Sequence, residues 1–473
     1  MSRWLGQAWP ARHKAALAAL GAYVALLAAT APAWPDDWDG VGFVESVHDF
    51  DMARFHPHPP GYPVYVALLR LAFALARDPM RACVLVAVLS GALVVSFVWA
   101  AVSRGAGERA AWTCAVLVAV CPLAWRACSG VGSEGLALAC AAACVYGLAS
   151  PGRAGALALG LGAGLGLGVR LSWAPVYLAA LVLTPRAGRA RAWTAAAIAS
   201  AAWAVPFVAV VGPSRLVALY EAHLAGHASR WGGTIMTEPG SVRFVWLARD
   251  VLVDGLGVGA DPLGLAIAMV ACVAAAQALV AWRAAAWKGW PAVLGLVLPY
   301  LVWIGLGQNL RDQPRHALPV VAALAGGLAL AAGRSRRARM VTGALALLVA
   351  TRTAFDAQAR RTVPPPGQQL VELARAQPSP ERMDVFGVSS VRFFETTELA
   401  AHAFQAGALG DVETHLQRVG ALPTRVWVTN ELEPRDGSPW LLVPVATLCR
   451  PVRIDRRAPC LDVLEWKVPY LPH

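Results

Sequence analysis

Charged residues are scarce in this sequence and unevenly placed. Of its 473 residues only 15% are charged and 57% are hydrophobic, whereas about a quarter of the residues in a soluble protein are charged. The charge deficit falls on residues 14–356, which consist largely of long apolar runs, while residues 357–473 have an ordinary soluble composition. Runs of about 20 apolar residues match a hydrocarbon core about 30 Å thick. The composition therefore excludes a wholly soluble protein and predicts a helical membrane domain.

Several chemical signatures are also missing. The sequence contains no P-loop and no G-x-S-x-G turn, which argues against a P-loop nucleotide site and a serine-hydrolase elbow. The glycines of residues 155–168 are typical of membrane helices that pack closely, because small residues let two backbones approach. Seven of the nine cysteines lie in apolar segments and are predicted to be small packing residues.

The net charge of +12 follows from short basic blocks between the apolar runs. Such blocks are the positive-inside signature of a membrane protein, and no folded basic face accompanies them, so no nucleic-acid partner is expected. The blocks comprise Arg3, Arg12 and Lys14; Arg104 and Arg109; Arg186, Arg189 and Arg191; Arg283 and Lys288; and Arg334, Arg336, Arg337 and Arg339.

Twelve apolar segments can be drawn, but the basic blocks cannot all face one side if every segment crosses. The conflict disappears if residues 62–77 do not cross, since this short segment follows a proline cluster and carries Arg70 and Arg77 on one helical face. We therefore expect it to lie along the interface. The spans are then 14–33, 82–102, 110–127, 134–150, 154–169, 171–185, 192–212, 262–283, 291–308, 316–333 and 340–355.

This pattern predicts a multi-pass protein of the cell inner (cytoplasmic) membrane with about eleven spans and a cytoplasmic N-terminus. The first helix is expected to be an uncleaved span and not a signal peptide, because its apolar stretch Ala18–Ala33 is long for a signal peptide and the proline makes Ala31-Pro32-Ala33 a poor cleavage site. The membrane domain is placed at 1–356. Its first extracytoplasmic loop is 34–81, which contains the interfacial helix 62–77.

The segment from Trp34 to Tyr65 concentrates acidic residues, followed by two histidines and a run of prolines. Acidic groups at a membrane interface are partly desolvated, which raises a carboxyl pKa and suits the group to act as a general base. A solvated acidic loop that ends at a proline turn is the alternative interpretation. The two stretches that stand out are Trp38-Asp39-Gly40-Val41-Gly42-Phe43 and His56-Pro57-His58-Pro59-Pro60-Gly61-Tyr62-Pro63.

These two stretches resemble the W-D-[SG]-x-x-F and H-P-H-P-P-G-Y-P motifs of a branch of the GT-C superfamily of membrane glycosyltransferases. Relatives in that superfamily include the protein O-mannosyltransferases and the aminoarabinose transferases. By motif position the resemblance implies that Asp39 is the base that deprotonates the acceptor, with Asp37 as the second candidate. It implies that His58 stands where a basic residue helps to hold the donor phosphate, with His56 beside it.

Other candidate substrate-binding residues lie farther along the chain. Glu134 opens a segment on the outer side, where it is either a site residue or an acid favoured by the helix dipole. Arg170 lies between two apolar segments, where an ionisable residue indicates a functional site, although an arginine can also extend to the interface. The loop of residues 309–319 supplies Arg311, Arg315 and His316, and arginine forks suit phosphate oxygens.

Residues 357–367 are predicted to be a linker and residues 368–473 a small extracytoplasmic α/β domain. Helices are expected at 368–377, 391–407 and 411–419, and strands at 384–387, 425–430, 441–448 and 461–468. Cys449 and Cys460 flank the turn between the last two strands, in a part of the chain placed in an oxidising compartment. A hairpin with a cross-strand disulfide is therefore predicted.

The expected fold is an all-α polytopic membrane domain with this small α/β domain. The expected activity is transfer of a hexose or pentose from a polyprenyl-phosphate donor to a glycan, lipid or protein acceptor at the extracytoplasmic face, among membrane lipids. The alternative is a transporter or flippase of a lipid-linked or anionic substrate, which usually shows internal repeats; none is found here. The sequence leaves open whether a divalent cation binds Asp37 and Asp39.

Overall fold

The computed structural model describes residues 11–229, 233–283, 290–418, 423, 425–432, 441–451, 455 and 459–467. Arg3 and Lys288 of the basic blocks lie outside these ranges. By their internal contacts the residues form two compact units. Unit 1 comprises Met1–Ala31 and Pro59–Ala357, and unit 2 comprises Pro32–His58 and Gln358–His473.

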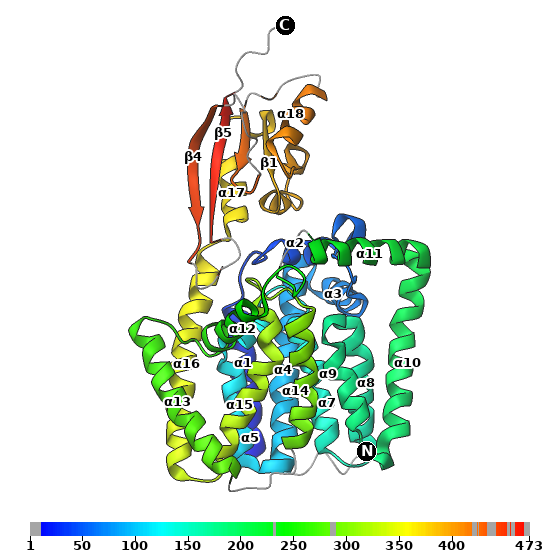
Figure 1. Cartoon of the computed structure of the whole chain (residues 1–473), viewed down its shortest axis with the longest axis vertical. Coiled ribbons are helices and arrows are strands. Elements are labelled where there is room, and N and C mark those ends of the chain that lie inside the picture. The colour runs from blue at the N-terminus through cyan, green and yellow to red at the C-terminus, as the bar shows by residue number, and fades with distance from the viewer. Residues whose placement is uncertain are drawn as a thin grey trace. The chain divides into compact units, whose positions relative to one another are not determined.

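Unit 1 is helical, and each apolar segment predicted from the sequence contains a helix. Most of these helices run side by side in Figure 1. They are α1 Ala11–Ala29, α3 Pro63–Ala76, α4 Pro79–Ala106, α5 Glu108–Val120, α6 Pro122–Ser129, α7 Glu134–Ala149, α8 Arg153–Val169, α9 Ala174–Leu183, α10 Arg186–Val211, α11 Pro213–Ser229, α12 Gly240–Arg249, α13 Pro262–Arg283, α14 Trp290–Leu306, α15 Leu318–Ala332 and α16 Arg336–Thr362.

Four helices are long and apolar enough to cross a membrane: Pro79–Ala106, Arg186–Val211, Pro262–Val280 and Arg336–Arg375. A fifth is added if α5 and α6, which meet at a bend of 68°, count as one span. The chain is thus an integral multi-pass membrane protein. The other apolar helices are 10–17 residues long, so the count of eleven spans stays a prediction.

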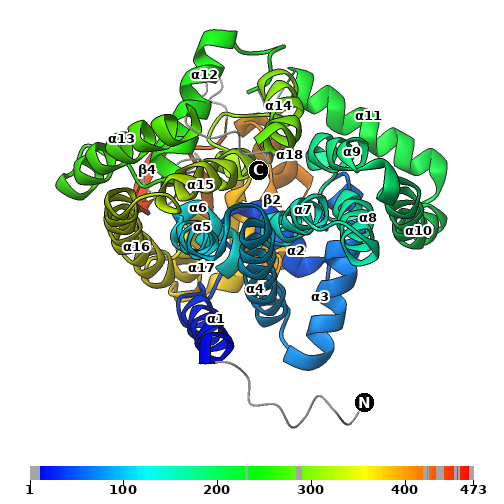
Figure 2. The same ribbon diagram turned by 90° about the horizontal axis from the view of Figure 1, so that it is seen from below.

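Helix α3, which occupies the segment expected along the interface, is oriented differently from the bundle. In Figure 2, α8 and α10 are seen end-on, whereas α3 and α11 are seen lengthwise. The helix begins at Pro63, since a proline has no N–H that the first turn would leave unpaired, and ends at Ala76, directly before Arg77, whose φ is +57°. This orientation agrees with a helix that lies along the interface, a location that stays a prediction.

Glycines let the helices of unit 1 pack closely, as the sequence predicted. A Cβ atom added to Gly164 on α8 would lie 2.5 Å from the carbonyl oxygen of Ala196 on α10, and one added to Gly162 would lie 2.8 Å from the carbonyl oxygen of Cys140 on α7. Both approaches are closer than a side chain allows. The cysteines of α5 to α7 are buried and free, consistent with packing residues.

Unit 2 contains a five-stranded sheet in the order β2-β1-β3-β5-β4. Strand β1 pairs in parallel with β2 and β3, whereas β5 is antiparallel to β3 and β4. Figure 1 shows this sheet with α17 and α18. The elements are β1 Met383–Gly387, β2 Ala403–Gln405, β3 Arg425–Thr429, β4 Leu441–Cys449, β5 Cys460–Lys467, α2 Trp38–Glu45, α17 Pro366–Arg375 and α18 Leu409–Arg418. The small C-terminal α/β fold is confirmed.

The disulfide between Cys449 and Cys460 is confirmed. The two residues are paired across the β4–β5 ladder, and their Cα atoms are 4.1 Å apart. The helix expected at 391–407 was wrong, because this stretch forms a 3₁₀ helix at Ser390–Phe394, a second one at Ala400–His402 and then strand β2. The pairing of β2 with β1 and the burial of Phe393 and Phe394 in the core outweigh the local helical pattern.

Residues 32–58, here called the acidic segment, belong to unit 2 by their contacts. The sequence assigned this stretch to the first loop of the membrane domain. Apolar packing explains this grouping. Val41 on α2 is 1% exposed and packs in one core with Leu370, Val385 and Phe394. The stretch that carries the predicted base is therefore built into the same unit as the C-terminal sheet.

Candidate functional site

Helix α2 positions the two candidate bases differently. Asp37 is the N-cap of this helix, and its Oδ1 accepts a hydrogen bond of 2.9 Å from the backbone N–H of Gly40. This capping bond satisfies one of the amide groups that a helix start leaves unpaired. Asp39 lies in the first turn and is 8% exposed. Asp37 therefore has a capping role that Asp39 does not share.

The structure brings Asp39 and His58 together. The Oδ1 atom of Asp39 lies 3.5 Å from Nδ1 of His58, and both side chains are nearly buried. The ring of Phe43, one turn farther along α2, lies 6.0 Å from the His58 ring. The two conspicuous sequence motifs, separated by a dozen residues, thus meet at one carboxylate–imidazole pair.

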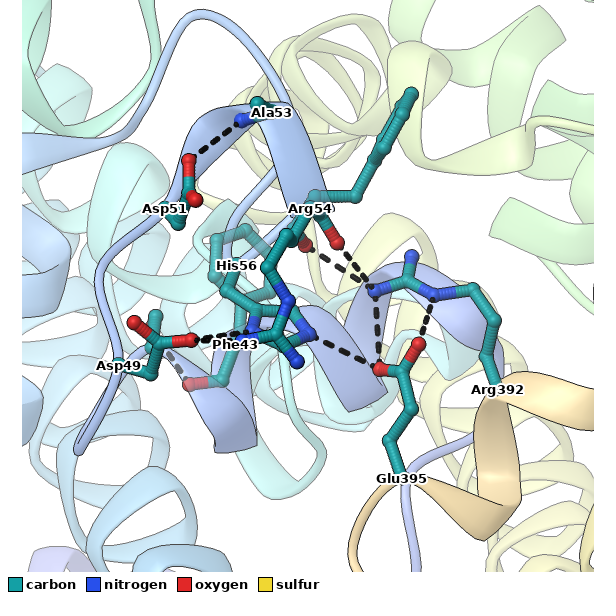
Figure 3. Close-up of polar contacts among 10 residues, drawn as sticks. Phe43, Asp49, Asp51, Ala53, Arg54, His56, Arg392 and Glu395 are labelled. Carbon is teal, nitrogen blue, oxygen red and sulfur yellow. Dashed lines mark hydrogen bonds and ion pairs between the residues drawn. The ribbon is translucent and has the colours of Figure 1, made fainter. Parts of the chain in front are cut away.

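His56 has a different environment, which Figure 3 shows. Its Nδ1 lies 3.3 Å from Oδ2 of Asp49, and its Nε2 lies 3.0 Å from Oε2 of Glu395. The residue is 1% exposed. Because a carboxylate lies against each ring nitrogen, this geometry is typical of a structural histidine and not of one that binds a phosphate.

Arg392 and Glu395 are residues that sequence reasoning missed. Nε of Arg392 donates to Oε1 of Glu395 at 3.3 Å. Burial alone would raise the pKa of Glu395, but the hydrogen bond with His56 and the positive charge of Arg392 outweigh burial and hold this pKa below its ordinary value. Glu395 is thereby stabilised as a carboxylate between its two partners. No local pattern around residues 392–395 indicated this role.

A second ionic cluster in unit 2 is centred on Asp36. Its Oδ1 accepts a hydrogen bond of 3.0 Å from Nη1 of Arg450, and Arg360 donates to both oxygens of the same carboxylate. All three side chains are buried. Nη2 of Arg450 also donates to the backbone oxygen of Arg360 at 3.1 Å. The cluster therefore connects the start of the acidic segment, the end of α16 and the β4–β5 connection.

Unit 1 contains a buried cluster made from three of the predicted site residues. Nη1 of Arg170, at the end of α8, lies 2.8 Å from Oε1 of Glu134 and donates to Oγ of Ser133 at 3.0 Å. Nη1 of Arg315 lies 3.7 Å from the same Oε1 of Glu134. Nε of Arg170 is buried without a hydrogen-bond partner among the described residues. Two guanidinium groups thus converge on one carboxylate.

Two buried tyrosines form hydrogen bonds to the backbone near this cluster. Tyr65 on α3 is fully buried, and its hydroxyl oxygen accepts a hydrogen bond of 3.1 Å from the backbone N–H of Gly132. The backbone oxygen of His316, the residue after Arg315, accepts a hydrogen bond of 2.9 Å from the hydroxyl of Tyr300. His316 is itself buried. Sequence reasoning missed both tyrosines, because their apolar neighbours indicate only core packing.

Arg311 does not join the cluster around Glu134. Its Nη1 lies 3.9 Å from Oε1 of Glu238, and its side chain is largely exposed. Among the described parts of the chain, no group of three or more histidine, cysteine, aspartate or glutamate side chains is arranged to hold a metal ion. The sequence leaves open a divalent cation at Asp37 and Asp39, and this geometry gives no support to one.

The sequence matches the model of the family described as dolichyl-phosphate-mannose-protein mannosyltransferase over residues 56–214. No curated protein sequence matches the chain. Among solved structures, ArnT from Cupriavidus metallidurans bound to undecaprenyl phosphate aligns with a TM-score of 0.60 and 13% identity. The alignment covers 96% of this chain and 98% of that one. The apo form of ArnT also aligns with a TM-score of 0.60, at 13% identity, covering 95% and 98%.

The chain has the fold of the GT-C glycosyltransferases. The resemblance stated from the two sequence motifs is thereby confirmed. Archaeoglobus fulgidus oligosaccharyltransferase aligns more loosely, with a TM-score of 0.47 and 13% identity over 90% of this chain and 70% of that one. At 13% identity the ArnT alignment establishes the GT-C fold and leaves the role of each residue to its own geometry.

Proposed function

We propose that this chain is an integral membrane glycosyltransferase that moves a sugar from a polyprenyl-phosphate donor to an acceptor at the extracytoplasmic face. The observation that carries the proposal is the alignment with ArnT over nearly the full length of both chains, since that structure holds undecaprenyl phosphate. The match over residues 56–214 to the family described as dolichyl-phosphate-mannose-protein mannosyltransferase points to the same class of donor.

The reaction needs a base for the acceptor hydroxyl, and Asp39 supplies it. The carboxylate takes the hydroxyl proton, the acceptor oxygen bonds to the anomeric carbon, and the bond from that carbon to the phosphate oxygen breaks. The polyprenyl phosphate leaves with the electron pair. Inversion at the anomeric carbon is implied by the resemblance to the superfamily. The burial of Asp39 and its contact with His58 support this assignment over the capping residue Asp37.

The departing phosphate needs positive charge, which arginine forks provide. Arg170 and Arg315 are the best-supported candidates, because their guanidinium groups converge on the buried carboxylate of Glu134, where electrostatic interactions are stronger than in water. Glu134 holds the two cations in place. His58, Arg311 and His316 stay proposed donor contacts, whereas His56 is better explained by its two carboxylate partners.

The proposed location is the inner (cytoplasmic) membrane, with the N-terminus in the cytoplasm and unit 2 outside. The disulfide between Cys449 and Cys460 supports this orientation, because disulfides persist in oxidising compartments and are rare in the cytoplasm. The basic blocks at Arg104 and at Arg334–Arg339, expected to be cytoplasmic, support it independently.

The test is a transfer assay. Membranes from cells with and without this chain are given a panel of radiolabelled polyprenyl-phosphate hexoses and pentoses, and the label is followed. The proposal expects one sugar to appear on a glycan, lipid or protein only when the chain is present. Label that crosses the bilayer while it stays attached to its lipid would support a flippase instead and would contradict the proposal.

A further inference from the structure

Arg392 donates hydrogen bonds to the backbone of the acidic segment at two places. Its Nη1 donates to the backbone oxygen of Trp38 at 3.4 Å, and its Nη2 donates to the backbone oxygen of Phe55 at 3.3 Å and of Arg54 at 3.5 Å. Trp38 directly precedes Asp39, and Phe55 lies three residues before His58. A planar guanidinium can serve several carbonyl groups at once because its donors are fixed in a fork.

Glu395 connects Arg392 to His56 of the acidic segment through side-chain contacts. It accepts from Arg392 at 3.3 Å through Oε1 and lies 3.0 Å from Nε2 of His56 through Oε2. On its other side His56 meets Asp49, and Asp49 accepts a hydrogen bond of 2.7 Å from Arg54. Figure 3 shows this continuous chain of contacts from Arg392 to Asp49.

The backbone of the acidic segment is closely packed beside Arg392. A Cβ atom added to Gly42 on α2 would collide with the backbone oxygen of Phe55 and would lie 3.5 Å from Nη2 of Arg392. The start and the end of the acidic segment therefore touch at Gly42 and Phe55, and Arg392 bonds to the backbone on both sides of this contact. The hydrogen bonds that Arg392 donates to the backbone are 3.3–3.5 Å long, so each is weak by itself. Arg392 therefore stabilises the segment through the three bonds together.

We propose that Arg392 and Glu395 are positioning residues that hold the acidic segment, and with it Asp39 and His58, in the arrangement that transfer requires. The proposal rests on the function proposed above and gives the C-terminal sheet a role in it, since the 3₁₀ helix Ser390–Phe394 of the same unit carries Arg392 and leads directly into Glu395. The sheet is then a structural support of the catalytic segment. A displacement of about 1 Å in a reacting group lowers turnover by about 10²-fold.

The test compares Arg392→Gln and Glu395→Gln with Arg375→Gln. Arg375 forms an ion pair with Glu398 at 2.7 Å in the same unit, but both side chains are exposed, and within the described part of the chain neither forms an ion pair with the acidic segment. We expect kcat to fall by about 10²-fold in Arg392→Gln, with the donor KM changed by less than about threefold, because the loss is one of positioning. Arg392→Lys restores a part of the loss, and Arg375→Gln keeps the original kcat.

A second measurement does not depend on activity. Trypsin cuts after arginine, and the Arg54–Phe55 bond lies between the two carbonyl groups that Nη2 of Arg392 holds. In the purified full-length protein, mass spectrometry should show this bond cut about tenfold faster in Arg392→Gln than in the original chain, because cleavage follows the population of the opened segment. Arg375→Gln should match the original chain.

The outcomes separate the two proposals. If Arg392→Gln keeps the original kcat and the original cleavage rate, the positioning proposal is overturned. It is also overturned if kcat falls while the Arg54–Phe55 bond stays protected. If the original chain transfers no sugar but the Arg54–Phe55 bond is still cut faster in Arg392→Gln, the proposed function fails. The structural role of Arg392 in holding the acidic segment is then still supported.

Discussion

The carboxylate of Glu134 lies 2.8 Å from the guanidinium of Arg170, and both side chains are buried. The two residues begin and end neighbouring helices, since Glu134 is in the first turn of α7 and Arg170 directly follows α8. A buried ion pair is costly to desolvate and adds little stability by itself. We therefore interpret this pair, with Arg315 at 3.7 Å from Glu134, as part of a phosphate-binding site in which Glu134 holds the two arginines together.

Replacing Arg170 tests this interpretation. Arg170→Gln removes a cation from the proposed phosphate site, so we expect kcat to fall by about 10²–10³-fold, the usual cost of losing one donor to a developing negative charge. Arg352→Gln is the matched control, because Arg352 pairs with Asp261 and, among the residues that the structure describes, forms no ion pair with a candidate site residue. Steady-state kinetics in the same membranes measure both variants. An equal loss in both would point to general destabilisation and contradict the assignment.

The topology makes a prediction about Arg104 and Arg337. Arg104 lies in the last turn of α4 and Arg337 in the first turn of α16, and the proposed eleven-span arrangement places both in the cytoplasm. Cysteines substituted at these positions in intact cells should react with a membrane-impermeant maleimide only after the cytoplasmic membrane is permeabilised. Labelling of either position without permeabilisation would reject the arrangement, including the location of α3 along the interface.

The disulfide makes a prediction about the compartment of unit 2. When cells are denatured with an alkylating reagent present, seven of the nine cysteines should be alkylated at once. Cys449 and Cys460 should react only after a reductant is added, as peptide mass spectrometry can show. Substituting both by serine opens a short loop, which should lower the stability of unit 2 by about 2–4 kcal/mol. Two reduced thiols in freshly lysed cells would place unit 2 in the cytoplasm.

The cluster around Asp36 predicts a large effect on stability. Asp36→Asn removes the carboxylate that accepts hydrogen bonds from both Arg360 and Arg450, and breaking such a buried ion pair typically costs about 3–5 kcal/mol. The apparent Tm of the detergent-solubilised protein should fall accordingly. Glu398→Gln, which breaks an exposed ion pair in the same unit, should leave Tm unchanged. A Tm of Asp36→Asn equal to that of Glu398→Gln would contradict the structural role of the cluster.

The helices of unit 1 and the hairpin of unit 2 could be predicted from the sequence because their signals are local. A membrane helix requires a continuous apolar run, and the two strands that flank Cys449 and Cys460 are adjacent in the chain. The helix expected at 391–407 failed because strand β2 depends on its pairing with β1, which the stretch itself does not encode. The motif residues Asp39 and His58 were recognisable for a similar local reason.

The partners of the motif residues could not be predicted in the same way. Asp36 is bound by Arg360 and Arg450, which are 324 and 414 positions away in the chain. His56 is held by Glu395, 339 positions away. An arginine or a glutamate in a soluble stretch looks the same whether it is solvated or buried in an ion pair, so the support that unit 2 gives to the acidic segment became visible only in the fold.

The most direct test of the account is the transfer rate of Asp39→Asn. This change keeps the size of the side chain and its place in the first turn of α2 but removes the base, so transfer of radiolabelled sugar should fall by about 10²–10⁴-fold while the protein still folds. Asp49→Asn, whose carboxylate pairs with Arg54 and His56, should lose much less. Full activity in Asp39→Asn, with activity abolished in Asp37→Asn, would contradict the assignment of the base; full activity in both would contradict the mechanism itself.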